Sequence, residues 1–388
     1  MKCVFVSNYF NHHQASLANE LKKLCEGQFW FISTIDVPEG RKKLGYASDC
    51  FPDYVVLSHK SKSLKKYSLN LINSADVVIV GSAPESYIKK RLSSNKLTFR
   101  CQERLYKEDI DKKRLPLLYL KHYLKHIRYK NLYLLCASAF TSADYSKTYA
   151  FEDKAYKWAY FTEIKKYDNI DNIISDKQPH SILWVGRLIK FKHPELVVEL
   201  AHRLKEEGYD FSVNIIGVGE MYDDIEKLIK DYGLTDCIHM LGSMPPEQVR
   251  TYMEKSEIFL FTSGKEEGWG AVLNESMNSA CAVIASHAIG SVPYLLNNGQ
   301  NGFVYRDGDI DDIYCKVKTL LDTPQKRKEL AKKAYYTMRN EWNAENAAKK
   351  FYSLVNIMLE ESENKFPYKD GVCSKAEITS DDWFISKQ

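Results

Sequence analysis

The feature that most constrains the fold is a regular alternation of short apolar stretches and amphipathic helical stretches in the second half of the chain. Parallel strands need a long crossover connection, usually a helix, so this alternation predicts a parallel, doubly wound α/β sheet. Ligands bind such sheets outside the carboxyl ends of the strands. We expect strands at 181–187, 211–217, 237–243, 257–262 and 282–286, with helices between them.

The first half shows the same alternation in a less regular form, with apolar stretches at 3–8, 28–34, 75–82 and 132–138. A chain of 388 residues exceeds the size at which one hydrophobic core is usual. We therefore predict two Rossmann-like domains that face each other across a cleft, an N-terminal one at 1–165 and a C-terminal one at 175–343. The polar stretch 163–180 is interpreted as a linker. We expect the C-terminal helix and tail, about 344–388, to pack back on the first domain.

Composition excludes several classes of protein. No apolar run approaches the ~20 residues that span a bilayer, and the N-terminal residues lack the apolar region and cleavage site of a signal peptide. Nine scattered cysteines without a CxxC pair indicate reduced thiols rather than a disulfide framework or a zinc site. These features predict a cytoplasmic protein.

Charge is divided unevenly along the chain. Residues 1–170 hold 29 Lys and Arg against 17 Asp and Glu, a net charge of +12, and the remainder holds 26 against 34, a net charge of −8. The basic half is expected to face an anionic partner, such as a membrane surface, a lipid pyrophosphate or nucleic acid. The alternative is a set of solvated, lysine-rich helices.

Residues 115–130 concentrate this charge in one predicted helix. Its apolar and basic residues form two stripes at helical spacing: Leu117, Leu120, Leu124 and Ile127, and Lys121, Lys125 and Arg128. The pattern is typical of a helix on a membrane surface. A helix whose apolar stripe is buried and whose lysines face solvent also explains the pattern, and we favour this second interpretation.

The stretch 261–287 places acidic residues where an anion site is expected. A strand ends in a polar loop with Glu266 and Glu267, and a helix begins at about Ala271 and carries Glu275. Carboxylates accept hydrogen bonds from hydroxyls, so these residues predict a sugar or ribose ligand. Eight helical residues would span about 12 Å, which suits two contact points on an extended ligand better than a glycosidase acid–base pair. Glu266 is expected to face solvent.

Two further motifs follow predicted strands. Arg187 and Lys192 lie in one loop, where they are suited to phosphate oxygens, although two solvated surface cations would give the same sequence. Gly217 and Gly219 form a GxG turn that lets backbone approach a phosphate. The rest of a dinucleotide fingerprint is missing, so this motif is equally compatible with a simple tight turn.

Together, GRLIKFK, IIGVGE and KEEGWGAVLNESMNSACAVIAS resemble the retaining nucleotide-sugar glycosyltransferases of family 4, which have the GT-B fold. The resemblance covers most of 181–342. It implies that Arg187 and Lys192 hold the donor diphosphate, Glu275 the ribose and Glu267 the donor sugar. It also places the nucleotide sugar against the following residues: Gly217, Gly219, Gly268, Trp269, Gly270, Ala271 and Val272.

Two segments depart from the pattern of this family. Residues 275–280 read ESMNSA where EAMAxG is frequent, and 290–294 read GSVPY where GGxPE is frequent, so that Tyr294 replaces a glutamate. The diphosphate residues are unaffected. The identity of the donor sugar is left open.

The first half resembles bacterial family members that build capsular or extracellular polysaccharide, which begin with an Asn-His-His-Gln loop, here residues 11–14. His13 is a candidate catalytic residue, and His12 and Glu103 are candidates on the acceptor side. The alternatives are a helix cap followed by two solvated histidines, and a salt bridge from Glu103 to a nearby arginine.

The resemblance implies transfer with retention from a nucleotide diphosphate sugar to a glycan or lipid-linked acceptor, with peripheral contact at the inner membrane face. Arg187 and Lys192 would supply the positive charge that a metal supplies elsewhere, so no metal or other cofactor is expected. Residues 307–309, formally a DxD, are interpreted as a turn. The rival enzymes are an epimerase or a phosphorylase on the same fold. A non-catalytic anionic-surface or nucleic-acid-binding protein is disfavoured, because RNA-module signatures are missing.

Overall fold

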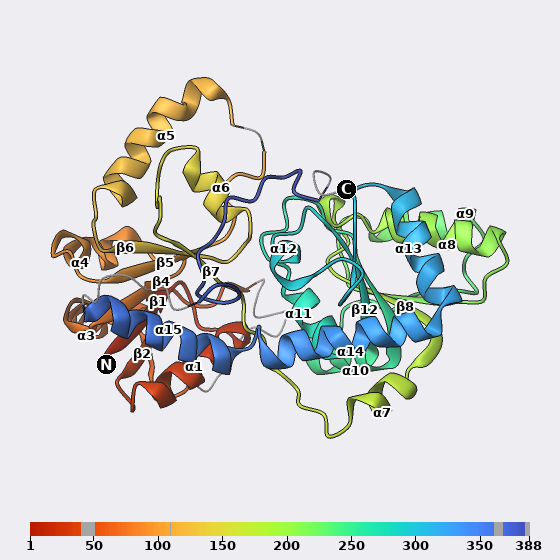
Figure 1. Cartoon of the computed structure of the whole chain (residues 1–388), viewed down its shortest axis with the longest axis horizontal. Helices are drawn as coiled ribbons and strands as arrows, with labels where there is room; N and C mark the ends of the chain where they lie inside the picture. The colour runs from red at the N-terminus through yellow and green to blue at the C-terminus, as the bar shows by residue number, and fades with distance from the viewer. Residues whose placement is uncertain (40–50, 109, 361–367, 385–388) are drawn as a thin grey trace. The chain divides into compact units, whose positions relative to one another are not determined.

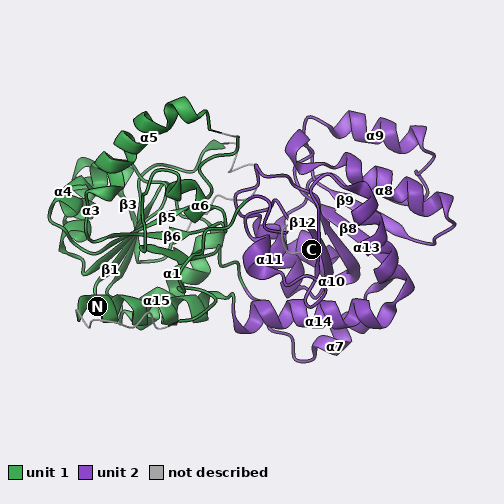
Figure 2. Ribbon diagram, turned by 45° about the horizontal axis from the view of Figure 1, so that its top comes forward, with its two compact units in different colours: residues 1–163, 342–380 green, residues 164–341, 381–388 purple. Residues whose placement is uncertain are grey.

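A computed structural model describes residues 1–39, 51–108, 110–360 and 368–384. It divides into two compact units (Figure 2). Unit 1 comprises Met1–Glu163 and Trp342–Ser380, and unit 2 comprises Ile164–Glu341 and Asp381–Gln388. The chain therefore passes between the units at three places.

Unit 1 is built on a seven-stranded sheet in the order β3-β2-β1-β4-β5-β6-β7, in which every pairing is parallel. Its strands β1 and β4 are largely apolar and buried along their whole length, as expected for a sheet covered on both faces. The strands are β1 Cys3–Ser7, β2 Phe29–Ser33, β3 Val55–Leu57, β4 Val77–Val80, β5 Thr98–Gln102, β6 Leu132–Cys136 and β7 Ala155–Lys157. The described α-helices of this unit are α1 His12–Leu24, α3 Lys62–Ser74, α4 Lys89–Ser93, α5 Leu115–His122, α6 Thr141–Ser146 and α15 Ala344–Leu359.

Unit 2 is built on a six-stranded parallel sheet in the order β10-β9-β8-β11-β12-β13. The strands are β8 Gln178–Val185, β9 Ser212–Ile216, β10 Ile238–Met240, β11 Ser256–Phe261, β12 Ala282–Ser286 and β13 Phe303–Tyr305. The helices are α7 Ile170–Ser175, α8 Glu195–Glu206, α9 Tyr222–Asp231, α10 Pro246–Lys255, α11 Ala271–Asn278, α12 Val292–Leu295, α13 Ile310–Asp322 and α14 Pro324–Asn340. The predicted parallel α/β architecture is confirmed in both units.

Hydrophobic periodicity explains why these helices lie where they do. In α8, Leu196, Leu200 and Leu204 follow one another every four residues and are all buried in the core of unit 2. Each buried leucine stabilises the fold by roughly 2 kcal/mol relative to an exposed one. The sheet supplies the other side of this core, through residues such as Ile182 and Ile258.

The predicted linker at 163–180 is wrong over much of its length. Helix α7 begins at Ile170, its amino terminus is capped by Asn169, and strand β8 already begins at Gln178. Asn169 Oδ1 accepts a hydrogen bond from the Asp171 amide at 2.9 Å. Ile170 and Ile174, one helical turn apart, are buried in the core of unit 2, and this short apolar pair was hidden by its polar neighbours.

The C-terminal part of the chain is shared between the two units. Helix α15, drawn in blue, packs against the red helix α1 in unit 1 (Figure 1). Lys375 forms an isolated bridge with Tyr156 in the same unit. From Asp381 onward the chain belongs to unit 2, where Trp383 Nε1 donates to the His287 carbonyl at 3.0 Å. Part of the predicted tail, at 361–367 and 385–388, lies outside the described residues.

The helix predicted at 115–130 is divided and oriented differently from the favoured interpretation. Helix α5 ends at His122, and a π-helical turn, η5, continues from Tyr123 to Ile127. Leu117, Leu120 and Leu124 are exposed, whereas the buried residues of this segment are His122 and His126. The interpretation with the leucine stripe buried is therefore wrong. Within the described residues, no helix is both long and apolar enough to cross a membrane.

Candidate functional site

The loops that follow β8 and β11 are tied together at the carboxyl ends of two neighbouring strands. Thr262 Oγ1 donates to the Lys192 carbonyl at 2.6 Å and accepts a hydrogen bond from Trp184 Nε1 at 2.8 Å. The Gly264 amide donates to the Phe191 carbonyl at 2.8 Å. Two segments that are about 70 residues apart in the chain therefore share one rigid edge of the sheet.

This edge brings together two of the predicted site residues. Lys192, the last residue of the short helix η6 (Lys190–Lys192), forms an ion pair with Glu267. Their side chains are only 12% and 15% exposed. A largely buried pair holds both charges in place, because each would be costly to leave unpaired. Arg187, in the same loop, is exposed, and among the described residues its side chain forms no ion pair with Glu267.

Glu266 differs from its predicted, solvent-facing position. It is partly buried, and a side chain built on Gly264 would place its Cβ 3.2 Å from Glu266 Oε2 and 3.5 Å from Asp307 Oδ2. The same Cβ would lie 3.4 Å from His193 Nε2. Glu266 therefore turns inward near the imidazole of His193, a residue that was not predicted from the sequence to belong to the site. The hydrogen bond of His193 Nδ1 to Glu195 Oε1, 2.8 Å long, raises the pKa of His193.

Helix α11 begins without a side-chain cap. Its N-cap residue is Gly270, with φ +81°, and a Cβ there would lie 2.3 Å from Cζ of Phe261. Only glycine satisfies both constraints. The first-turn amides, beginning at Ala271 and Val272, thus have no side-chain acceptor at the cap and no acidic residue within the first turn. Such a helix end is suited to an anionic ligand.

Glu275 lies one turn further along α11 and is half-buried. Burial raises the pKa of Glu275 to about 7, and the positive charge of Arg250 opposes that rise. The carboxyl group is therefore close to half-protonated at neutral pH. An exposed glutamate, such as Glu247 on α10, lacks this environment.

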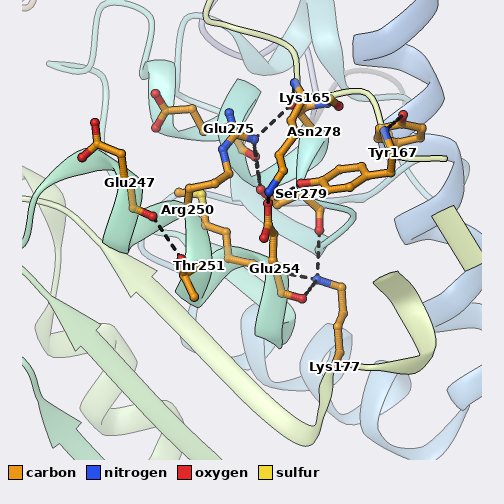
Figure 3. A network of polar contacts seen from close by, with 12 residues as sticks. Lys165, Tyr167, Lys177, Glu247, Arg250, Thr251, Glu254, Glu275, Asn278 and Ser279 are labelled. Carbon is orange, nitrogen blue, oxygen red and sulfur yellow. Dashed lines mark hydrogen bonds and ion pairs between the residues drawn. The ribbon is translucent and has the colours of Figure 1, made fainter. Parts of the chain in front are cut away.

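Arg250, on α10, holds the carboxyl end of α11 (Figure 3). Its guanidinium Nη1 donates to the Glu275 carbonyl at 3.2 Å, to Asn278 Oδ1 at 3.0 Å and to Ser279 Oγ at 3.1 Å. Asn278 in turn pairs with the backbone of Lys165, accepting from its amide at 2.9 Å and donating to its carbonyl at 3.1 Å. The first residues of unit 2 are thus fixed to the helix that carries Glu275. The one signal in the sequence is Asn278 itself, at a position where the resembling family often has alanine.

Lys177, a buried cation, supports the same helices. Lys177 Nζ donates to the carbonyls of Met253 and Ser279 at 2.9 Å each, near the ends of α10 and α11 (Figure 3). Cations are favourable at helix carboxyl ends, where unpaired carbonyls accumulate. Burial lowers the pKa of Lys177. Glu254 completes the network by accepting hydrogen bonds from Lys165 and Tyr167, each at 2.6 Å.

The GxG motif has a packing explanation. Gly217 has φ +143°, and a Cβ there would lie 1.8 Å from the Gly186 carbonyl oxygen. A Cβ on Gly219 would lie 2.2 Å from the Leu188 carbonyl oxygen. The turn after β9 therefore needs glycine because it lies directly against the loop that carries Arg187. This contact accounts for both glycines, and their predicted contact with a nucleotide sugar stays a prediction.

The segment that departs from the family pattern packs near α11. Trp269 is buried, its Nε1 donates to Asn274 Oδ1 at 2.9 Å, and its ring lies 6.3 Å from the ring of Tyr294. Gly268, which precedes it, is also buried. The tyrosine that replaces the usual glutamate thus contributes an aromatic contact. Ser291 Oγ, in the same segment, is buried without a hydrogen-bond partner among the described residues.

Residues 307–309 form the predicted turn. Gly308 has φ +73°, and the Asp309 amide donates to the Arg306 carbonyl at 2.9 Å. Asp309 caps α13, accepting from the Asp312 amide at 3.0 Å. Asp307 Oδ1 accepts from Ser286 Oγ at 2.9 Å. Among the described residues, no cluster of three or more His, Cys, Asp or Glu is arranged to hold a metal ion.

The candidate residues of unit 1 follow two strands of its sheet: His12 and His13 come after β1, and Glu103 comes after β5. Asn11 caps α1 by accepting from the His13 amide at 3.0 Å, as the alternative interpretation of this loop predicts. His12 is exposed, His13 is partly buried, and their ring centroids are 3.9 Å apart. Glu103, just after β5, accepts a hydrogen bond from the Tyr160 hydroxyl, which the sequence reading did not anticipate.

Comparison with known proteins identifies the C-terminal unit. Residues 166–337 match the family model of the glycosyl transferases group 1. The amylovoran biosynthesis glycosyltransferase AmsK of Erwinia amylovora is 32% identical over 137 residues, which cover 34% of this chain and 33% of AmsK. A diphospho-undecaprenol 4-alpha-N-acetylgalactosaminyltransferase of Campylobacter jejuni is 31% identical over 153 residues, covering 39% of this chain and 40% of the relative. The chain thus spans less than half the length of these two relatives.

Similarity in structure extends over both units. The structure of Anabaena Alr3699/HepE, solved in complex with UDP, superposes with a TM-score of 0.67 at 13% identity, covering 92% of this chain and 100% of that one. At this identity the likeness concerns the fold. Residues 166–337 therefore form a group 1 glycosyltransferase domain, and the chain has the α/β, two-unit GT-B fold of these enzymes.

Proposed function

We propose that the protein transfers a sugar, with retention at the anomeric carbon, from a nucleotide diphosphate sugar to a glycan or lipid-linked acceptor during polysaccharide biosynthesis. The observation that carries this proposal is the buried ion pair of Lys192 and Glu267 at the carboxyl ends of β8 and β11. A cation suited to phosphate and an acid suited to hydroxyls are held side by side. A sugar diphosphate presents these two groups next to each other.

The charges of the site suit the departure of a nucleoside diphosphate. The bond from the anomeric carbon to the β-phosphate oxygen breaks, and negative charge develops on that oxygen. Lys192, Arg187 and the uncapped amides of α11 would stabilise this charge, which is the main way a fixed polar site accelerates such a step. In this proposal the diphosphate replaces Glu267 as the partner of Lys192, and Glu267 turns to the hydroxyls of the donor sugar.

Glu275 would hold the ribose. A carboxyl group with a pKa of about 7 either accepts a hydrogen bond from a hydroxyl or donates one, so it can bind the ribose in either protonation state. Its backbone is held by Arg250, which therefore acts on the ribose site indirectly. Gly217, Gly219 and residues 268–272 would line the nucleotide sugar. The positive charges of Lys192 and Arg187 at the diphosphate would make a metal ion unnecessary.

Unit 1 would bind the acceptor. His13 would receive the acceptor proton as the new glycosidic bond forms, with His12 and Glu103 as further contacts. The names of both relatives are consistent with this acceptor class, since one acts in the biosynthesis of a polysaccharide and the other on a diphospho-undecaprenol substrate. A lipid-linked acceptor would place the protein on the cytoplasmic side of a membrane, in peripheral contact with it.

The test is a radiolabelled transfer assay with a panel of nucleotide sugars, an acceptor extract and EDTA. Lys192→Ala is expected to lower transfer at least about 100-fold, because one charge-assisted contact in the transition state supplies about 3 kcal/mol. Lys190→Ala is the matched control, since Lys190 lies in the same turn and is exposed. Near-normal transfer by Lys192→Ala, or loss of all transfer in EDTA, would contradict the proposed roles. Conversion of the donor without acceptor would indicate an epimerase.

A further inference from the structure

Helix α5 and the π-helical turn η5 that continues it present an apolar face to the outside of unit 1. Leu117, Leu120 and Leu124 are 69%, 53% and 47% exposed, and Tyr119 and Tyr123 are 44% exposed each. The leucines are spaced three and four residues apart, so they share one face of the helix. In Figures 1 and 2 the helix lies at the periphery of unit 1, apart from the strands of its sheet. Scattered exposed leucines are ordinary, but a contiguous row of them marks an interaction surface.

The opposite face of the segment explains why the leucines point outward. His122 and His126 are the buried residues, at 4% and 7% exposure. His122 Nδ1 lies 2.6 Å from Thr148 Oγ1, and the His126 ring packs 5.4 Å from Tyr145 and 5.1 Å from Phe151. Burial lowers the pKa of both histidines, so uncharged rings face inward at neutral pH. The two histidines are therefore the buried contacts of this segment, whereas Leu117, Leu120 and Leu124 stay largely exposed.

Positive charge surrounds the leucine row. Residues 111–130 contain seven Lys and Arg against one Asp, a net charge of +6. All seven are exposed: Lys112, Lys113, Arg114, Lys121, Lys125, Arg128 and Lys130. Among the described residues, no carboxylate forms an ion pair with any of them. A row of apolar side chains bordered by unpaired cations is complementary to a surface that is apolar inside and anionic outside.

We propose that the outer face of α5 and η5, formed by Leu117, Leu120 and Leu124 with the seven neighbouring cations, docks on an anionic phospholipid bilayer. The leucines would enter the boundary of the acyl chains while the lysine and arginine side chains reach the phosphates, as in helices that lie in a membrane interface. Tyr119 and Tyr123, amphipathic rings, suit the headgroup level. This face would provide the membrane contact of the proposed function, and the proposal rests on that function in this respect.

Vesicle sedimentation with the full chain tests the proposal without any donor or acceptor. The probes are vesicles of phosphatidylcholine alone and of phosphatidylcholine mixed with phosphatidylglycerol, each at low and at high salt. The unmodified chain is expected to bind the anionic vesicles at low salt and to bind the neutral ones at least about tenfold less. Lys121→Gln with Lys125→Gln is expected to weaken anionic binding about 25-fold, since one lysine near an anionic surface contributes about fivefold.

The leucine variant separates docking from charge attraction. Leu117→Ser with Leu120→Ser and Leu124→Ser is expected to weaken binding at least about tenfold while leaving thermal stability unchanged, because these side chains are exposed. Lys227→Gln with Lys328→Gln, which removes two exposed lysines of unit 2, is the charge-matched control and is expected to bind normally.

Several results would overturn the proposal. One is equal binding by the leucine variant and the unmodified chain. Another is equal binding to neutral and anionic vesicles. A third is a dimer that the leucine variant dissociates, with vesicle binding unchanged, which would assign the face to a second copy of the chain. Stabilisation by UDP, measured on the same samples, reports on the proposed function separately: a chain that docks on vesicles yet neither binds nucleotides nor transfers sugar would contradict only the latter.

Discussion

Glu275 is expected to make the protein less stable as the pH rises from about 5 to about 7. Burial raises the pKa of this carboxyl from its ordinary value of 4.5 to about 7. Between these two values the folded chain keeps a proton on Glu275 that the unfolded chain has released. The unfolded state then binds fewer protons than the folded state, so the free energy of unfolding falls as the pH increases. A salt-bridged carboxylate has the opposite sign.

The magnitude follows from the same two values. Each pH unit between them corresponds to 1.36 kcal/mol, so the contribution of Glu275 to the free energy of unfolding falls by roughly 3 kcal/mol over this range. Glu275→Gln removes the titration and keeps the shape of the side chain. The stability of the unmodified chain relative to Glu275→Gln is therefore expected to fall by about 3 kcal/mol between pH 4.5 and pH 8, with little further change above that.

Urea unfolding curves of both proteins at several pH values measure this difference. Glu247→Gln is the control, because Glu247 is an exposed glutamate on the neighbouring helix α10 and its loss should leave the pH dependence intact. A difference between the unmodified chain and Glu275→Gln that stays constant across the range would refute the reasoning, since it would mean that the Glu275 carboxyl titrates alike in the folded and unfolded chain.

Substitutions at Gly270 and Arg250, each with a matched comparison variant, test the local structure of the site. Gly270→Ala is expected to lower the free energy of unfolding by about 3 kcal/mol, because it combines φ +81° with a Cβ 2.3 Å from the Phe261 ring. Gly308→Ala, with φ +73° and no atom within 4 Å of its Cβ, should cost only about 1 kcal/mol, and equal losses in thermal denaturation would contradict the steric argument. Arg250→Met is expected to destabilise by about 2 kcal/mol, because three acceptors lose one donor, and also to raise the pKa of Glu275 further. Arg250→Lys keeps the positive charge but not the geometry of the guanidinium, so it is expected to recover part of the lost stability. Urea unfolding of both variants at several pH values measures how much of the loss comes from the charge and how much from the hydrogen bonds.

Local patterns in the sequence determined the architecture. Apolar strands with helices between them identify parallel sheets, because two neighbouring parallel strands must be joined by a long crossover, usually a helix. The observed β11, Ser256–Phe261, and the start of α11 at Ala271 lie within one residue of their predicted positions. Placing Lys192 and Glu267 each after a strand was also possible from the sequence, since residues at the carboxyl ends of parallel strands share one edge of the sheet.

Only the tertiary structure decided which residues meet and which faces are covered. Lys192 and Glu267 pair because β8 and β11 are neighbours, and strand order is not encoded in any local pattern. The inward turn of Glu266, and the hold of Arg250 on α11, depend on side chains from segments distant in the chain. Helix α5 shows the limit most clearly. Its leucine period predicts an apolar face but not where that face points, and two buried histidines, with partners from other segments, turn it outward.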